Sequence, residues 1–246
     1  MDIFKIVQWT LAKKAVVILC LMAVAVILSD TLLAQESAGV PVATRSWFAL
    51  FQQTGFVGIL LLLLSVGGMA LVIEHIVNIR IEKIVPPDLV AQLDEAFEQG
   101  DTEKAYEICQ TRDSYLSRVV KAGLEAGGTG ELAQEASRET AAEETFGLNM
   151  KISYLSLVGN LAPLLGLLGT VTGMISSFQE IENKKAPTPA DLAKGVYESL
   201  VNTTMGLFAA LCFLTAYFIF KNKVSKMTLT AGNTALLLLR DRSAAA

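Results

Sequence analysis

Three long runs of apolar residues dominate the chain, and stretches rich in charge separate them. Each run is long enough to cross a bilayer as a helix, which requires about 20 residues. The runs extend from Trp47 to Val77, from Lys151 to Phe178 and from Val196 to Phe220. The pattern therefore predicts an all-α integral membrane protein with three transmembrane helices.

A shorter apolar run, from Ala15 to Leu28, follows a pair of lysines near the start of the chain. Its length is typical of the core of a signal peptide, and Ala34 is a suitable cleavage position. We therefore expect residues 1–34 to be a signal peptide or a retained N-terminal anchor. Either arrangement places the next segment, residues 35–46, in the periplasm.

Positive charge marks one end of the first and third apolar runs as cytoplasmic. Arg80 and Lys83 follow the first run, and three further lysines follow the third, at 221, 223 and 226. This asymmetry predicts a chain whose N-terminal end lies outside the cytoplasm. The expected order is a transmembrane helix at 47–79, a cytoplasmic domain at 80–150, a transmembrane helix at 151–178, a periplasmic loop at 179–195, a transmembrane helix at 196–220 and a cytoplasmic tail at 221–246.

The region between the first and second spans has the periodicity of soluble helices. Apolar residues recur every fourth position from Leu89 to Phe97, a turn is expected at Gly100, and a second amphipathic stretch continues through Leu124. The polar segment that ends at Met150 is expected to run as a helix straight into the second span. We therefore predict a helical cytoplasmic domain, whose acidic excess is either a solvated surface or a docking face for a partner.

The second and third spans each carry a stripe of small and polar residues. On the second span the positions follow steps of three and four, which place them on one helical face, opposite large residues such as Leu164 and Leu168. The stripes comprise Gly159, Pro163, Gly166, Thr170, Gly173 and Ser177 in the second span, and Ser199, Asn202, Thr203, Gly206 and Ala210 in the third. Close helix packing through small residues explains such stripes, and so does an ion pathway.

Glu198 favours the ion pathway. It lies beside the stripe of the third span, and a carboxylate near the membrane interior costs at least about 2.5–3.5 kcal/mol, so it usually faces a cavity or a partner. Its position near the outer end of the span also allows it to reach the interface. Two stripes and a carboxylate together make an ion pathway the better prediction.

Composition excludes several classes of function. The chain is 52% hydrophobic and 18% charged, whereas about a quarter of a soluble domain is charged. The net charge of −4 argues against nucleic-acid binding. The three cysteines lie far apart, and the only histidine, His75, is expected at the membrane interface. We therefore expect no disulfide framework, no metal site, no cofactor and no enzymatic activity.

Two stretches carry a family resemblance: "APLLGLLGTVTGMISSF" in the second span and "GVYESLVNTTMGLFAAL" in the third. They resemble the proton-channel family of ExbB, TolQ and MotA, and the ExbB/TolQ branch most. Thr170 matches the threonine of the family's second span, whereas Glu198 and Thr203 match the glutamate and threonine of its third. Cys212 stands where the family has a proline, so the shape of the third helix is open.

The resemblance implies an ion-conducting motor subunit of the bacterial inner membrane. It implies a homopentamer whose second and third spans line a pore, with Thr170, Thr203 and Glu198 on the ion pathway. It also implies a single-span partner similar to ExbD or TolR that supplies a transmembrane aspartate, and a TonB-like protein as a further partner. Either protons or sodium ions would drive the motor. The alternative is a non-conducting scaffold of a membrane complex.

Overall fold

The computed structural model describes residues 55–128, 130–183 and 188–240, without the side chains of residues 189–194 and 198. The secondary structure in these ranges is helical. Its order is α3 (Gly55–Asn78), α4 (Ile81–Ile84), α5 (Pro87–Glu98), α6 (Thr102–Thr111), α7 (Tyr115–Gly127), α8 (Glu131–Asn183) and α9 (Pro189–Leu238). The expected signal peptide or anchor, the periplasmic segment at 35–46 and the start of the first span lie outside the described residues.

Three of these helices are long and apolar enough to cross a membrane, as the sequence predicts. They are α3, α8 and the part of α9 from Gly195 onward. α8 has 53 residues and α9 has 50, which correspond to about 80 and 75 Å at 1.5 Å per residue. The hydrocarbon core of a bilayer is only about 30 Å thick. Both helices therefore continue well beyond the membrane.

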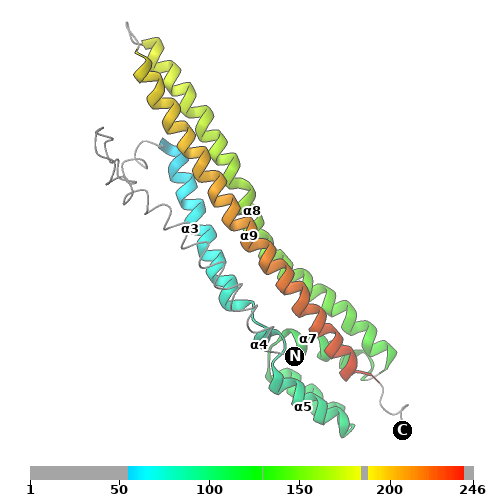
Figure 1. The fold of residues 1–246 in the computed structure, drawn as a ribbon. Coiled ribbons are helices and arrows are strands. Elements are labelled where there is room, and N and C mark those ends of the chain that lie inside the picture. The colour runs from blue at the N-terminus through cyan, green and yellow to red at the C-terminus, as the bar shows by residue number, and fades with distance from the viewer. Residues whose placement is uncertain (1–54, 129, 184–187, 241–246) are drawn as a thin grey trace, which may run out of the picture. The chain divides into compact units, whose positions relative to one another are not determined.

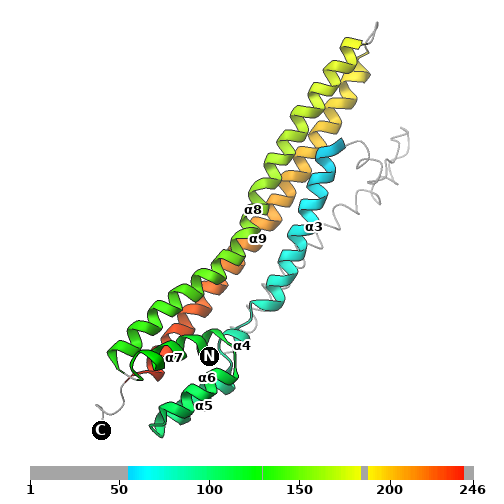
Figure 2. The ribbon, with the colours of Figure 1, turned by 180° about the vertical axis from the view of Figure 1, so that it is seen from behind.

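The chain divides into two compact units. The first combines the described residues up to Val72 with Tyr154–Tyr217, and the second combines Ile73–Ser153 with the described residues from Phe218. In both units α8 and α9 run side by side (Figures 1 and 2). Each unit is thus built around a different stretch of the same helix pair.

In the first unit, α3 approaches the pair through a glycine. A Cβ atom on Gly68 would lie 2.7 Å from the ring of Phe213 on α9 and 2.9 Å from Val158 on α8. Val57, Leu61 and Val72 are also buried on α3. The first span therefore packs against both of the others.

The turn between the second and third spans is shorter than predicted. We expected a loop at 179–195, but α8 continues to Asn183 and α9 begins at Pro189. Proline suits the first turn of a helix, because the amide hydrogen that it lacks would have no intrahelical acceptor there. Pro163, by contrast, lies inside α8.

In the second unit, α5, α6 and α7 follow the short α4 in the region between the first two spans. Leu89, Leu93 and Phe97 are buried on α5, as their spacing predicts, and Gly100 takes a positive φ of 71° at the expected turn. The second amphipathic stretch is two helices, α6 and α7, and not one. Ser114 caps α7 by accepting a hydrogen bond from the amide of Ser117 at 3.1 Å, which stabilises the break.

The tail after the third span packs in the second unit as a continuation of α9. Its buried residues follow helical spacing: Val224, Met227, Ala231, Ala235 and Leu238. The described part of the expected tail is therefore a packed helix. The polar segment of α8 before Met150 runs without a break into the second span, also as predicted.

His75, which we expect at the membrane interface, is buried within the chain. Its ring lies 5.6 Å from that of Phe220, and Nε2 is 3.2 Å from the carbonyl oxygen of Lys151. These contacts join α3 to both long helices within the second unit. Its position is that of a packing residue.

Candidate ion pathway between α8 and α9

The two stripes of small residues meet each other in the first unit. A Cβ atom on Gly206 would lie 2.5 Å from the carbonyl oxygen of Ala162, and one on Gly166 would lie 3.1 Å from the Cα atom of Thr203. Real Cβ atoms do not approach other atoms so closely as the first distance, so a glycine at position 206 allows the backbones to touch. We call this line of contact between α8 and α9 the seam.

The two threonines that the resemblance assigns to the ion pathway lie together on the seam. The hydroxyl groups of Thr170 and Thr203 are hydrogen-bonded to each other. Thr203 Oγ1 is 3.1 Å from the carbonyl oxygen of Gly166, and Thr170 Oγ1 is 3.2 Å from the carbonyl oxygens of Gly166 and Ser199. Both side chains are half-buried.

This hydroxyl pair has more acceptors than protons. A hydroxyl donates one hydrogen bond and accepts up to two. One proton lies between the two oxygens, and the other is left to choose between the carbonyl oxygens of Gly166 and Ser199. The pair can therefore reverse the direction of its hydrogen bonds without moving a heavy atom. That property suits a site that solvates water or an ion, and it also suits a purely structural contact between α8 and α9.

Other polar members of the stripes are buried against the seam. Ser199 donates to the carbonyl oxygen of Val196 at 2.8 Å, and Ser177 donates to that of Gly173 at 2.8 Å. Asn202 is only 4% exposed, and its Oδ1 atom has no hydrogen-bond partner. An unsatisfied buried oxygen costs about 1–3 kcal/mol, so Asn202 is the least satisfied of these buried residues.

The remaining stripe positions allow the two helices to pack closely. A Cβ atom on Gly159 would lie 2.8 Å from the side chain of Leu214, and one on Gly173 would lie 2.9 Å from that of Ser199. Ala210 is buried, and Pro163 is half-buried. The side chain of Glu198 lies outside the described residues, so its role stays a prediction.

Sequence reasoning missed two residues of the seam. The carbonyl oxygen of Ala162 lies against Gly206. Gly169 lies against Asn202, because a Cβ atom at position 169 would be 2.8 Å from the Cβ atom of Asn202. Both positions fit the three-and-four spacing of the stripe on α8. Their small size at that spacing was the signal that would have identified them.

The large side chains on the opposite face of α8 point away from the seam. Leu164, Leu168, Val171 and Ile175 are all exposed. Their exposure agrees with a face that meets lipid or another subunit. Among the described residues, no group of three or more His, Cys, Asp or Glu side chains is placed to hold a metal ion.

Comparison with known proteins decides the family. A sequence model of the MotA/TolQ/ExbB proton channel family matches residues 111–232, which include α7, α8, the seam and most of α9. The chain belongs to this family. Members named ExbB and TolQ are among its relatives, as the following matches show.

The chain is 36% identical to the biopolymer transport protein ExbB of Salmonella typhimurium over 91 residues, which are 36% of this chain and 37% of that protein. It is 34% identical to the Tol-Pal system protein TolQ of Pseudomonas aeruginosa over 95 residues, 39% of this chain and 41% of that protein. An ExbB homolog of Methanothermobacter thermautotrophicus is 25% identical over 174 residues, 68% of this chain and 60% of that protein. The matches thus span less than two thirds of these relatives.

Proposed function

We propose that the protein is an ion-conducting motor subunit of the bacterial inner membrane. With a partner similar to ExbD or TolR, it would couple the proton or sodium motive force to mechanical work, such as TonB-type transport across the outer membrane. Five copies would form the conducting ring. The observation that carries the proposal is the hydroxyl pair of Thr170 and Thr203, which joins two membrane-spanning helices in a member of a proton-channel family.

The hydroxyl pair would serve the ion by replacing part of its hydration shell. Threonine oxygens accept from water or coordinate a cation, and their protons hydrogen-bond to a carboxylate. A carboxylate in a dry environment prefers its protonated form. The partner's aspartate would thus bind a proton in a dry position and release it where water enters. Glu198, nearer the outer end of α9, would tune the entry to this path.

The membrane potential limits the mechanical work that one ion can drive. One charge that crosses 100 mV releases about 2.3 kcal/mol. Mechanical work on another protein therefore requires several ions for each stroke.

A non-conducting scaffold is the second candidate, and one observation favours it. The hydroxyls of Thr170 and Thr203 are already bonded within the chain, to each other and to backbone oxygens of Gly166 and Ser199. Threonine often bonds to its own helix, as Thr170 does to Gly166. Hydrogen bonds between membrane helices contribute about 0.6 kcal/mol on average. On this account the pair serves only to fasten α8 to α9.

Replacement of each threonine by valine separates the two functions. Valine keeps the shape of threonine and removes the hydroxyl group. We expect Thr170→Val and Thr203→Val to assemble normally with the partner but to abolish growth that depends on the cognate energised transport system. Assembly is followed by native mass spectrometry of the same membranes. Full growth of both variants would support the scaffold and contradict the motor.

A further inference from the structure

A break in the chain at the end of the first span carries an arginine. In the second unit α3 ends at Asn78, and Arg80 is extended, with φ −126° and ψ 142°, before the short α4 begins (Figures 1 and 2). The amide of Arg80 donates to the carbonyl oxygen of Asn78 at 3.1 Å, and its own carbonyl oxygen accepts from the amide of Lys83 at 3.1 Å. The backbone of Arg80 is therefore satisfied within the chain.

The side chain of Arg80 is not satisfied in the same way. Its Nε atom is buried without a hydrogen-bond acceptor, and no carboxylate of the described residues lies within salt-bridge distance of the guanidinium. The side chain is half-buried, so the charge has lost part of its water, while an anion can still reach it from outside. Burial of a charge costs free energy unless the charge is paired. The guanidinium therefore lacks a counter-ion that its burial calls for.

Two lysines lie beside Arg80 at this break. Lys83 donates from Nζ to the side-chain oxygen of Asn78 at 3.2 Å. Lys223 of α9 donates from Nζ to the carbonyl oxygen of Ile79, which is the residue before Arg80. The first contact spans the break, and the second holds an ammonium group against the backbone next to the arginine. Three cations, from two parts of the chain, are therefore gathered at the end of α3.

Exposed apolar side chains adjoin these cations. Ile73, Val77 and Ile81 are 56%, 47% and 39% exposed. Ile73 and Val77 lie one helical turn apart on α3, so they share a face. This face belongs to a helix that is long and apolar enough to cross a membrane. An apolar face that ends at a group of cations fits a molecule with apolar chains and an anionic head.

We propose that Arg80 binds the phosphate group of an anionic phospholipid at the end of the first span. A planar guanidinium forms two parallel hydrogen bonds with phosphate oxygens, which a single ammonium group does not. Lys83 and Lys223 add positive charge, and basic residues next to a span attract lipids of net negative charge. The acidic residues of this stretch, Glu74 and Glu82, are both exposed, and the three cations outnumber them. The site therefore selects an anionic headgroup over a zwitterionic one.

The place of the site in the chain favours a lipid over a soluble anion. The first candidate span ends at Asn78, and Arg80 follows it by two positions, at the level where the headgroups of the bilayer begin. A free phosphate ion would contact the cations but would leave Ile73 and Val77 uncovered, whereas the acyl chains of a lipid cover them. The inference does not depend on ion conduction, because it uses neither threonine of the seam.

Thermal unfolding of the full-length protein, delipidated in a maltoside detergent, tests the proposal. The probes are phosphatidylglycerol and phosphatidylcholine with the same short acyl chains, and inorganic phosphate. A ligand that binds the folded protein raises its unfolding temperature as the ligand concentration rises. We expect phosphatidylglycerol to act at a concentration about tenfold lower than phosphatidylcholine, because only the first carries a net negative charge. Inorganic phosphate should cause no shift at the same concentrations.

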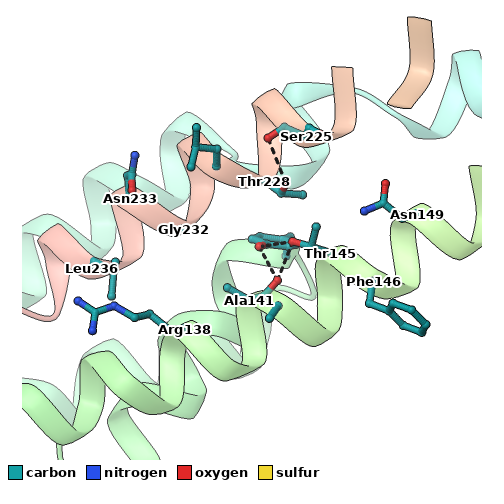
Figure 3. A pocket seen from close by; sticks show the side chains of 13 residues that line it. Arg138, Ala141, Thr145, Phe146, Asn149, Ser225, Thr228, Gly232, Asn233 and Leu236 are labelled. Atoms are coloured by element: carbon teal, nitrogen blue, oxygen red, sulfur yellow. Dashed lines mark hydrogen bonds between the residues drawn. The ribbon is translucent and has the colours of Figure 1, made fainter. Parts of the chain in front are cut away.

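Three variants locate the site. Arg80→Gln should weaken the binding of phosphatidylglycerol about tenfold, and Lys83→Gln about threefold, because a lysine contributes charge without the fork of an arginine. Each shift is measured against the same variant without lipid, so a change in the variant's own stability cancels. The matched control is Arg138→Gln, which removes the same charge from an exposed arginine of α8 that lines the groove between α8 and α9 (Figure 3). It should bind the lipid as the wild-type protein does.

Several results overturn the proposal. An equal shift with inorganic phosphate would show a plain anion site, and an equal shift with the two lipids would show that the headgroup charge is not recognised. Unchanged binding in Arg80→Gln, or an equal loss in Arg138→Gln, would show that the lipid responds only to the charge of the whole protein. Native mass spectrometry of the wild-type protein applies even where Arg80→Gln does not fold. Phosphatidylglycerol should then stay bound at collision energies that remove phosphatidylcholine, and simultaneous loss of both lipids contradicts the site.

Discussion

Gly206 lets α9 lie against the backbone of α8. A Cβ atom there would stand 2.5 Å from the carbonyl oxygen of Ala162, which is backbone and cannot turn aside. Gly67 on α3 is a contrast, because a Cβ atom there would have no neighbour within 4 Å. Packing within the chain therefore requires a glycine at position 206 but not at position 67.

Alanine at these two positions should act in opposite directions. We expect Gly206→Ala to destabilise the protein by about 1–3 kcal/mol, the usual cost of overpacking. Gly67→Ala should be neutral or stabilising by up to about 1 kcal/mol, because alanine is the better helix former. Thermal unfolding in one detergent measures both. Equal stability of the two variants would mean that the helices are not in contact at Gly206.

Cys109 should be an unreactive thiol. Burial raises its pKa to about 11, although the positive charge of Lys121 opposes the shift. At pH 8 the thiolate is then scarce, so alkylation by iodoacetamide should be at least tenfold slower than in the unfolded chain. Because the folded pKa lies above the unfolded value, this group's contribution to stability is complete below pH 9 and is lost as the pH rises towards 11.

Peptide mapping by mass spectrometry follows the alkylation of Cys109 specifically. The control is the same reaction after denaturation, where the rate should be that of an ordinary cysteine. Rapid alkylation of the folded protein at pH 8 would show that α6 opens and that its buried face is accessible.

Among the elements, α7 contacts α8 through the Tyr115 hydroxyl, which donates to the carbonyl oxygen of Ala141 at 3.0 Å, through Ser137, and through an arginine. Arg118 binds Glu144 through two hydrogen bonds, of 2.7 Å from Nε and 2.9 Å from Nη2, and it also binds Asp113. A paired geometry of this kind is the strong form of an ion pair. By contrast, Lys121 and Glu125 form a single exposed contact of 3.8 Å within α7.

Removal of the positive charge at Arg118 and at Lys121 should therefore lower the free energy of unfolding by different amounts. Since Arg118 is 43% exposed, we expect Arg118→Gln to lower the free energy of unfolding by only about 1 kcal/mol. Lys121→Gln should lower it by less than about 0.5 kcal/mol. Urea unfolding followed by circular dichroism gives both values, and 1 M NaCl should shrink the larger one. A larger effect at Lys121 would contradict the assigned contact.

Helix faces and helix lengths were predictable from the sequence to different degrees. The period of apolar residues identified Leu89 and Phe97 as buried, because a helix repeats every 3.6 residues. The break before α7 was missed, because it depends on a hydrogen bond from the Ser117 amide to Ser114 and not on periodicity. The loop at 179–195 was predicted too long, since polar residues continue a helix once they leave the membrane.

In the candidate site, sequence placed Thr170 and Thr203 on small-residue stripes but not against each other. The spacing of a stripe shows which residues share one face of a helix. It does not show which other helix that face contacts. The structure brings the two stripes together along the seam. The pore that the resemblance implies would form where copies of the chain meet, and it remains part of the proposal.

For the molecule as a whole, the distribution of positive charge predicts the topology. Lysine and arginine follow α3 and the apolar part of α9, and such residues stay on the cytoplasmic side. We expect Glu103→Cys in α6 to react in spheroplasts only with a membrane-permeant maleimide. Glu182→Cys, at the other end of α8, should react with an impermeant one. The reverse pattern of labelling would invert the topology.

Ion flux through the assembled protein tests the central claim, that the Thr170–Thr203 hydroxyl pair lies on the ion path. The measurement is dye-reported flux of H⁺, and in parallel of Na⁺, into proteoliposomes that hold the chain and its partner. Matched controls are Thr172→Val and Thr204→Val. Within the described part of the chain, these exposed threonines bond only to their own helix, at 2.9 Å to Leu168 and 3.0 Å to Leu200.

We predict at least a tenfold loss of flux in Thr170→Val and Thr203→Val, with an intact oligomer, and wild-type flux in both controls. Wild-type flux in all four variants would contradict the claim and leave the pair as a structural clasp between α8 and α9.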